Sequence, residues 1–126
     1  MSVKILTIDD SKTIRLIVAK SFKPYDCTVI EAENGVVGLA AATRERPDII
    51  LLDCHMPNMN GIETIRRLRE NPFWAHIPII VTTGDVFSAT IERLLEAGAT
   101  TYLKKPIDHL ALRKAISLYL KKLPQN

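Results

Sequence analysis

The chain lacks the features that mark membrane, secreted and zinc-binding proteins. Within its 126 residues no apolar run approaches the ~20 residues that a membrane-spanning helix needs. Its first residues enter an apolar segment at once, with no signal-peptide cleavage pattern. The two cysteines, Cys27 and Cys54, form no CxxC pair, and the three histidines show no zinc-ligand spacing. These absences predict a cytoplasmic protein with reduced thiols and no membrane contact.

Concentrated positive charge is also missing, although the net charge is +3 from 17 Lys and Arg against 14 Asp and Glu. The basic residues are scattered, and their densest group, residues 66–69, is typical of the solvated face of a helix. No aromatic residues alternate with them to stack on bases, so we expect no direct contact with nucleic acid. The length, with 47% apolar and 25% charged residues, predicts one domain over residues 1–126.

What the chain does have is an alternation of two hydrophobic periods. Short β-branched runs, typical of strands, occupy residues 3–8, 28–30, 49–52, 79–83 and 101–103. Apolar residues at helical spacing form three stripes between them: Ile14, Ile17, Val18 and Phe22; Phe87, Ile91, Leu94 and Leu95; and Leu112, Ile116, Tyr119, Leu120 and Leu123. Two further helices are predicted at residues 35–46 and 61–70, the second burying Ile62, Ile65 and Leu68.

Helix-capping and helix-ending residues agree with this division. Ser11 and Asn34 precede the first two helices as N-caps, Pro24 ends the first, and Gly98 follows the fourth as a C-cap. The predicted order is βαβαβαβαβα. Because each crossover must be right-handed and must cover the sheet, this order implies a doubly wound α/β fold with a parallel sheet and helices on both faces.

Chemically active side chains stand where the predicted strands end. In an open doubly wound sheet, ligands bind beyond the carboxyl ends of the strands. The first strand is followed by Asp9 and Asp10, the third by Asp53, the fourth ends in residues 82–84, Thr-Thr-Gly, and the fifth leads to residues 104–106, Lys-Lys-Pro. If strands one and three are neighbours, three carboxylates converge.

Three adjacent carboxylates repel one another and need a compensating cation. The fifth strand supplies a lysine, and Mg²⁺ is the natural metal for an all-oxygen cluster. The hydroxyl of Thr83 and a lysine ammonium are good donors to a phosphoryl group. Together these groups predict metal-assisted phosphoryl transfer onto a carboxylate, with Asp53 as the nucleophile.

Four motifs in this order carry a family resemblance: "ILTIDDSKTIR", "LLDCHMPNMNG", "PIIVTTGD" and "TTYLKKPI". The sequence resembles the receiver domain of two-component response regulators, of the single-domain, chemotaxis CheY-like type. The resemblance covers essentially the whole chain. It implies a flavodoxin-like fold of five parallel strands and five helices with strand order 2-1-3-4-5.

The same resemblance implies roles for the acidic residues. Asp53 corresponds to the phosphoacceptor and is itself a ligand of the metal. Asp10 corresponds to a direct Mg²⁺ ligand, Asp9 to a partner that acts largely through metal-bound water, and His55 supplies its backbone carbonyl as the last protein ligand.

The resemblance also implies a switch. Thr83 corresponds to the switch hydroxyl, and Thr82 is the neighbouring candidate if the register is shifted by one. Lys105 corresponds to the lysine that pairs with the phosphoryl group, and its bond to Pro106 is usually cis in the family. Tyr102 stands at the aromatic switch position, with a half-buried core tyrosine as the competing interpretation.

The implied function is a phosphorylation-dependent signalling switch rather than an enzyme. It would accept a phosphoryl group from a sensor histidine kinase or a phosphotransfer protein, and then change the surface of helix 4, strand 5 and helix 5 for a downstream target protein. Leu110 and Leu118, off the stripe of the last helix, are candidates for that surface or scattered surface leucines. His55 and Asp85 either flank the path of the hydrolytic water or are solvated bystanders.

Four alternatives remain open. The first is a phosphorylation-independent adaptor, that is, a degenerate receiver. The second is a receiver excised from a longer regulator or hybrid kinase. For a receiver of either kind we expect a monomer or a phosphorylation-dependent dimer. A flavin carrier shares the architecture, but Asp9 and Asp10 would repel its phosphate. A Mg²⁺-dependent phosphatase with an aspartyl intermediate would have an acid where this chain has His55.

Overall fold

The computed structural model describes residues 3–56 and 59–119. Its strands form one parallel sheet in the order β2-β1-β3-β4-β5. Their bounds are β1 (Val3–Ile8), β2 (Cys27–Ala32), β3 (Ile49–Asp53), β4 (Ile79–Thr83) and β5 (Thr101–Lys104). The fold class and the strand order predicted from the sequence are therefore confirmed.

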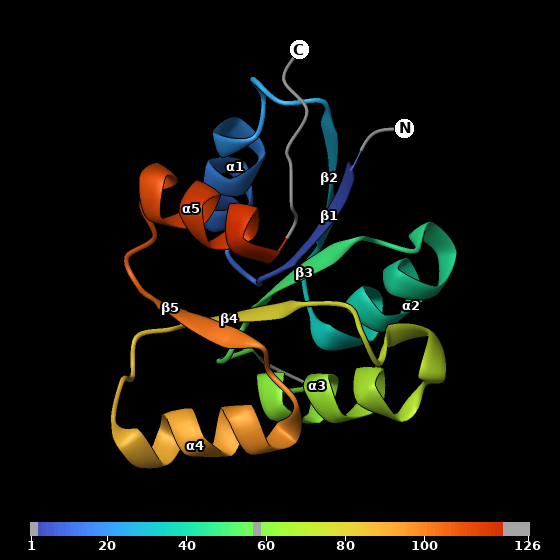
Figure 1. The fold of residues 1–126 in the computed structure, drawn as a ribbon, viewed down its shortest axis with the longest axis vertical. Helices are drawn as coiled ribbons and strands as arrows, with labels where there is room; N and C mark the ends of the chain where they lie inside the picture. The colour runs from blue at the N-terminus through green and yellow to red at the C-terminus, as the bar shows by residue number, and fades with distance from the viewer. Residues whose placement is uncertain (1–2, 57–58, 120–126) are drawn as a thin grey trace.

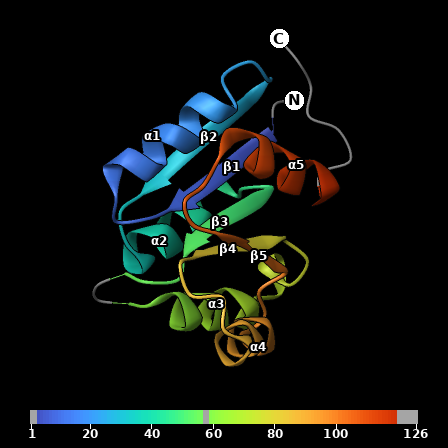
Figure 2. The ribbon, with the colours of Figure 1, turned by 90° about the vertical axis from the view of Figure 1, so that its left-hand side faces the viewer.

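Helices cover both faces of this sheet, as Figures 1 and 2 show. Their bounds are α1 (Lys12–Ser21), α2 (Gly35–Glu45), α3 (Gly61–Glu70), α4 (Ser88–Ala97) and α5 (His109–Tyr119). Helices α1 and α5 lie on one face, and α2, α3 and α4 lie on the other. Within the described residues no helix is long and apolar enough to cross a membrane.

The core is divided between these two faces. One cluster packs sheet residues against α1 and α5 and includes Ile5, Val18, Phe22, Ile49, Leu51, Ile80, Leu112 and Ile116. The other packs the opposite face of the sheet against α2, α3 and α4 and includes Leu6, Ile8, Ile50, Leu52, Ile65, Leu68, Val81 and Leu94. Because both faces are covered, every residue of β3 and β4 is buried, which explains their unbroken apolar runs.

The predicted helix caps are confirmed. The side chain of Ser11 accepts the N–H of Ile14, and that of Asn34 accepts the N–H of Val37. Gly98 ends α4 with φ at 121°, a conformation that favours glycine.

Two predicted stripes are partly wrong. Helix α4 begins after Phe87, which is 78% exposed, and Leu95 is 46% exposed. In α5, Tyr119 is 38% exposed, while Leu120 and Leu123 lie outside the described residues. A periodic pattern gives the angular position of a residue on a helix but not how far the neighbouring elements extend over it.

The loop predicted before β4 contains a short 3₁₀ helix, η1 (Pro72–Trp74). Asn71 begins it, because its side chain accepts the N–H of Phe73, and Pro72 supplies a preset φ at the first position. Trp74 is buried against the core, so this segment closes the amino end of the sheet rather than standing free in solvent.

A partly buried cation, Arg69, joins several backbone segments at the same end of the sheet. Arg69 Nε donates to the carbonyl of Gly98 at 2.9 Å, and its Nη1 donates to the carbonyls of Ile77, at 2.8 Å, and Trp74. Its Nη2 lies 3.4 Å from Thr100 Oγ1. Burial lowers the pKa of Arg69. The prediction that residues 66–69 form only a solvated face is therefore wrong for this residue.

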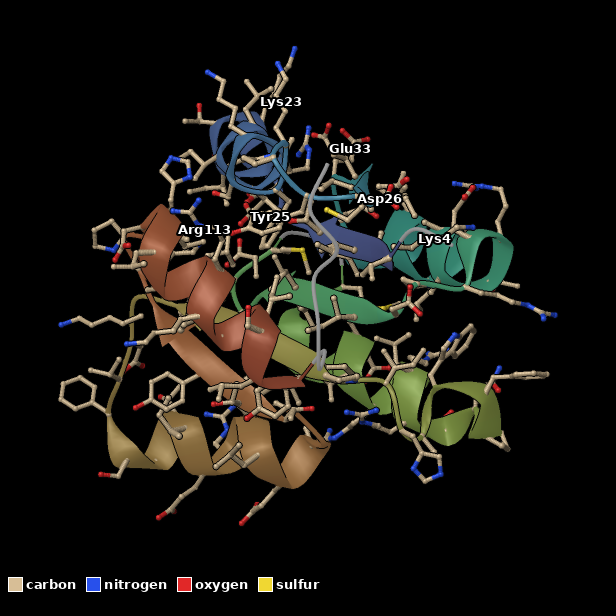
Figure 3. The ribbon with its side chains drawn as sticks, turned by 45° about the horizontal axis from the view of Figure 1, so that its top comes forward. Lys4, Lys23, Tyr25, Asp26, Glu33 and Arg113 are labelled. Atoms are coloured by element: carbon tan, nitrogen blue, oxygen red, sulfur yellow. The ribbon has the colours of Figure 1, made fainter. Side chains whose placement is uncertain are left out.

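A second cation acts in the same way at the start of β1. Lys4 lies beside α2 in Figure 3, and its Nζ donates to the backbone carbonyl of Glu45 at 3.0 Å. Its backbone N–H donates to Asp48 at 2.7 Å. At the amino ends of the strands, cations thus donate to backbone carbonyls, of which those of Glu45 and Gly98 lie at the ends of helices.

Candidate functional site

Three carboxylates meet at the carboxyl ends of β1 and β3. Asp9 and Asp53 are each 2% exposed, and Asp10 is exposed. One carboxylate oxygen from each residue lies within 4.8 Å of the others. The convergence follows from the pairing of β1 with β3, in which Ile8 stands opposite Leu52.

The turn into α1 fixes the side chain of Asp9. The N–H of Ser11 donates to Asp9 Oδ1 at 2.9 Å, and Ser11 also caps α1. Burial raises the pKa of Asp9 to about 6; the Ser11 amide opposes this shift, and the charge of Asp53 adds to it. A cation bound beside Asp9 would therefore stabilise its charged form and the whole cluster.

Lys105 supplies one positive charge to this group. Its Nζ lies 2.9 Å from Asp53 Oδ1, which also accepts the N–H of His55 at 3.2 Å. Burial of the ammonium acts to lower its pKa, but the hydrogen bond and charge of Asp53 outweigh this and hold the pKa of Lys105 above its usual value. The Lys105–Pro106 bond is cis, as the resemblance led us to expect.

The start of α3 packs against the backbone beside Asp53. The N–H of Gly61 donates to the carbonyl of Cys54 at 3.2 Å, and a Cβ at Gly61 would lie 2.9 Å from the Cys54 Cα. Asn60 caps α3 by accepting the N–H of Glu63 at 2.9 Å. The sequence predicts the start of this helix at Gly61, but the capping role of Asn60 was not predicted, although Asn followed three positions later by Glu is a helix-start signal.

The two threonines that end β4 point to opposite faces of the sheet. Thr83 is fully buried, and its hydroxyl donates to the carbonyl of Asp85 at 3.1 Å and accepts the N–H of the same residue at 3.0 Å. Thr82, not Thr83, stands opposite Asp53 in the register of β3 and β4. The structure thus does not bring the Thr83 hydroxyl into a hydrogen bond with Asp53.

Two further predicted residues, Tyr102 and Asp85, lie on β5 and in the loop after β4. Tyr102 lies on β5 opposite Val81 and is 40% exposed. The carboxylate of Asp85 accepts the N–H of Phe87 at 3.0 Å and the hydroxyl of Thr90 at 2.8 Å. These bonds lower the pKa of Asp85, and the charge of His55 contributes.

The residue that follows Asp53 is a buried cysteine, Cys54. Cys54 is buried, and both cysteines are free thiols. Burial, followed by the charge of Asp53, raises the pKa of the Cys54 thiol. A raised pKa keeps the thiol protonated and a poor nucleophile, which agrees with the reduced state expected from the sequence.

The chemistry of the donor set fits Mg²⁺. All three converging side chains offer oxygen, and two of them are buried carboxylates whose charges repel. A hard divalent cation that takes one or two carboxylates and completes its shell with water and phosphoryl oxygens suits this arrangement. Thiolate and imidazole, which favour softer metals, are not among the converging ligands of the described residues.

Comparison with protein families agrees with this geometry. The family model of the response regulator receiver domain matches residues 5–117. The chain belongs to this family. Receiver domains are signalling switches rather than classical enzymes, bind Mg²⁺ at their acidic site, and interact with histidine kinases or phosphotransfer proteins.

Curated relatives of this receiver differ greatly in length. The chain is 41% identical over 113 residues to the response regulator PleD of Caulobacter vibrioides, covering 89% of this chain but only 25% of PleD. It is 37% identical over 118 residues to the protein PilH of Pseudomonas aeruginosa, covering 93% of this chain and 97% of PilH. The chain thus spans a quarter of the first relative and nearly all of the second.

Solved structures show the same fold. The chemotaxis response regulator CheY4 of Vibrio cholerae superposes with a TM-score of 0.90 at 29% identity, covering 94% of this chain and 99% of that one. The receiver domain of the sensor histidine kinase PA1611 of Pseudomonas aeruginosa superposes with a TM-score of 0.87 at 24% identity, covering 97% and 100%. That structure has a magnesium ion coordinated in its active site cleft.

Proposed function

We propose that residues 1–126 form a receiver domain that is phosphorylated on Asp53 by a sensor histidine kinase or a phosphotransfer protein in the cytoplasm. The observation that carries this is the contact between Lys105 Nζ and Asp53 Oδ1 at 2.9 Å within the cluster of three carboxylates. This contact supports the proposal, because it brings together groups whose chemistry suits a nucleophile, a cation for the transferred group and ligands for Mg²⁺.

The residues divide the work as follows. Asp10 and Asp53 would hold Mg²⁺ directly, Asp9 would act largely through water on the metal, and the backbone carbonyl of His55 would complete the protein ligands. The metal would supply positive charge for the phosphoryl oxygens. The Asp53 carboxylate attacks phosphorus, and the bond from phosphorus to the donor histidine breaks with its electron pair on the imidazole. The ammonium of Lys105 pairs with the new phosphoryl oxygens.

Phosphorylation then changes a surface. The Thr83 hydroxyl leaves the backbone of Asp85 for a phosphoryl oxygen, which repacks the loop after β4 and lets Tyr102 turn inward. Leu110 and Leu118, 68% and 78% exposed on α5, lie on the face that a downstream target protein contacts. The protein is a monomer, or a dimer formed on phosphorylation.

Intact-protein mass after incubation with acetyl phosphate tests this function. We expect a Mg²⁺-dependent gain of one phosphoryl group in the parent protein and no gain in Asp53→Asn. The variant is the matched control, because Asn keeps the shape of the side chain and removes the nucleophilic oxygen. No gain in either protein, with acetyl phosphate or with a phosphorylated histidine kinase, would leave the phosphorylation-independent adaptor as the better account.

A further inference from the structure

Thr82 carries a buried hydroxyl that has no hydrogen-bond partner. It is the one such buried side-chain atom among the residues that the structure describes, and Thr82 is 2% exposed. A buried hydroxyl without a partner is destabilising relative to a methyl group of the same shape. Valine at this position would therefore make the unphosphorylated state more stable than threonine does. A threonine here is explained if its hydroxyl gains a hydrogen-bond partner in another state.

Its position beside the acceptor suggests what that partner is. Thr82 stands opposite Asp53 in the register of β3 and β4, and paired parallel strands lie about 4.8 Å apart. Both side chains line a void under the carboxylates, together with Thr7 and Asp9. The void is too small to hold a water molecule, so no internal water can satisfy the hydroxyl. A hydrogen bond from Thr82 Oγ1 to the Asp53 carboxyl group therefore requires only a rotation about χ1 of Thr82, without movement of either strand.

In the structure the Asp53 carboxyl group already accepts two hydrogen bonds from other residues. Asp53 Oδ1 accepts from Lys105 Nζ and from the N–H of His55. A phosphoryl group adds a charge of about −1.5 to −2, which draws the Lys105 ammonium away from Oδ1. The carboxyl oxygen of Asp53 then loses the charged hydrogen-bond donor Lys105, and the Thr82 hydroxyl is free to donate in its place.

We propose that Thr82 replaces Lys105 as the hydrogen-bond donor to the Asp53 carboxyl group in the phosphorylated protein and speeds hydrolysis; this rests on the proposed function of Asp53. In hydrolysis a water oxygen attacks phosphorus and the bond from phosphorus to Asp53 breaks. The electron pair of that bond stays on the carboxylate, and the proton of the water passes to the departing phosphate.

The direction of the effect follows from where charge appears. Negative charge grows on the leaving carboxylate in the transition state, so a donor to that carboxylate is worth more there than in the acyl phosphate. In the forward transfer the free carboxylate is fully charged at the start. The same donor then stabilises the reactant at least as much as the transition state and does not speed phosphorylation.

Thr82→Val tests the proposal, because valine keeps the shape and removes only the hydroxyl. Parent and variant are phosphorylated with acetyl phosphate and Mg²⁺, the donor is removed, and the loss of the phosphoryl group is followed by intact mass. We expect the half-life of the phosphorylated form to lengthen about tenfold in Thr82→Val. Thr82→Ser, which restores the hydroxyl, should stay within about twofold of the parent.

Two controls separate a chemical role from a structural one. Thr7→Val changes the lining of the same void at a position opposite Leu51, two residues before Asp53 on β3. The half-life of its phosphorylated form should equal that of the parent. In the metal-free, unphosphorylated protein, Thr82→Val should raise the melting temperature by about 3 °C, because an unpaired buried hydroxyl is gone.

The outcomes are distinct. An unchanged or shorter half-life in Thr82→Val would overturn the role of the hydroxyl, even if the melting temperature rises. An equal lengthening in Thr7→Val would assign the effect to the void and overturn it as well. If the parent gains no phosphoryl group from any donor, the proposed function itself fails, and the role of Thr82 falls with it.

Discussion

The two ends of the strands treat charge in opposite ways. At the amino ends, Arg69 and Lys4 donate to backbone carbonyls, and each of these cations stabilises the junction of several elements. At the carboxyl ends, Asp9, Asp10 and Asp53 face one another, with Lys105 bound to one of them. At the first end the cations donate hydrogen bonds to groups of the fold itself, whereas the second end gains stability from a further cation.

This difference shows how one fold separates stability from function. The amino ends carry charges whose partners are parts of the fold itself. The carboxyl ends concentrate negative charge that the fold does not neutralise, which lowers the stability of the free protein. That charge remains available for a metal ion and a phosphoryl group.

The largest expected effects come from replacing one cation at each end with methionine, in the variants Arg69→Met and Lys105→Met. In Arg69→Met the carbonyls of Gly98, Ile77 and Trp74 lose their hydrogen-bond donor. The free energy of unfolding should therefore fall by about 3 kcal/mol. In Lys105→Met phosphorylation should slow about 100-fold with far less loss of stability, because in our proposal Lys105 pairs with the transferred phosphoryl group.

Urea unfolding and the rate of phosphoryl gain from acetyl phosphate, measured on both variants, test this contrast. At urea concentrations at which Arg69→Met is still folded, its rate of phosphoryl gain should match that of the parent protein. A slower rate in folded Arg69→Met would show that the division between the two ends is wrong. A lower free energy of unfolding in Lys105→Met than in Arg69→Met would show the same.

Gly61→Ala should be the next most damaging change. An added Cβ would meet the backbone of Cys54 at 2.9 Å and the carbonyl of Asp53 at 3.0 Å, so the start of α3 must shift at a cost of about 2 kcal/mol. Gly84→Ala is the matched control, because nothing lies within 4 Å of a Cβ there. Thermal unfolding of both variants decides; equal melting temperatures would contradict the close approach at Gly61.

Removing an anion should stabilise the metal-free protein. The pKa of Asp9 is raised to about 6, so its contribution to stability is fully present below about pH 4 and is lost as the pH rises through about 6. Asp9→Asn should therefore be more stable than the parent at pH 7.5 by about 2 kcal/mol, and this advantage should shrink at pH 4.5.

Mg²⁺ should reverse that order, since it stabilises the parent and binds the variant less tightly. Urea unfolding at both pH values, with Mg²⁺ and with a chelator, measures these four states. A variant that is less stable than the parent at pH 7.5 without metal would show that the carboxylate of Asp9 is not under strain.

The smallest effects are expected outside the carboxylate cluster. The electrostatic coupling of Asp85 with His55 motivates the hypothesis that the two flank the path of the hydrolytic water. His55→Asn and Asp85→Ala should each change the half-life of the phosphorylated form about threefold, with the melting temperature unchanged. Unchanged half-lives in both variants would make these residues bystanders.

The sequence predicted the carboxyl ends far better than the amino ends. Strand ends are visible as the limits of apolar runs, and a parallel sheet brings their carboxyl ends together, so Asp9, Asp10 and Asp53 could be grouped without coordinates. The four motifs then separated Lys105 from its neighbour Lys104, which the strand pattern alone does not do.

What stayed hidden depends on tertiary contacts. Arg69 belongs to a basic run that is typical of an exposed helix face. It becomes a partly buried donor only because the chain around η1 and after α4 places backbone carbonyls around it. Phe87 fits a helical stripe, but α4 begins one residue later. The unpaired hydroxyl of Thr82 is likewise invisible in a β-branched strand residue, because a missing partner is a property of its surroundings.

The most direct test of the central claim is to locate the phosphoryl group. After brief exposure to acetyl phosphate with Mg²⁺, the acyl phosphate is reduced with borohydride, and peptide mass spectrometry identifies the carboxylate that carried it. Our account predicts modification of Asp53 alone, dependent on Mg²⁺ and slowed by Lys105→Met. Modification of Asp9 or Asp10 in place of Asp53, or a metal-independent reaction at several surface carboxylates, would contradict it.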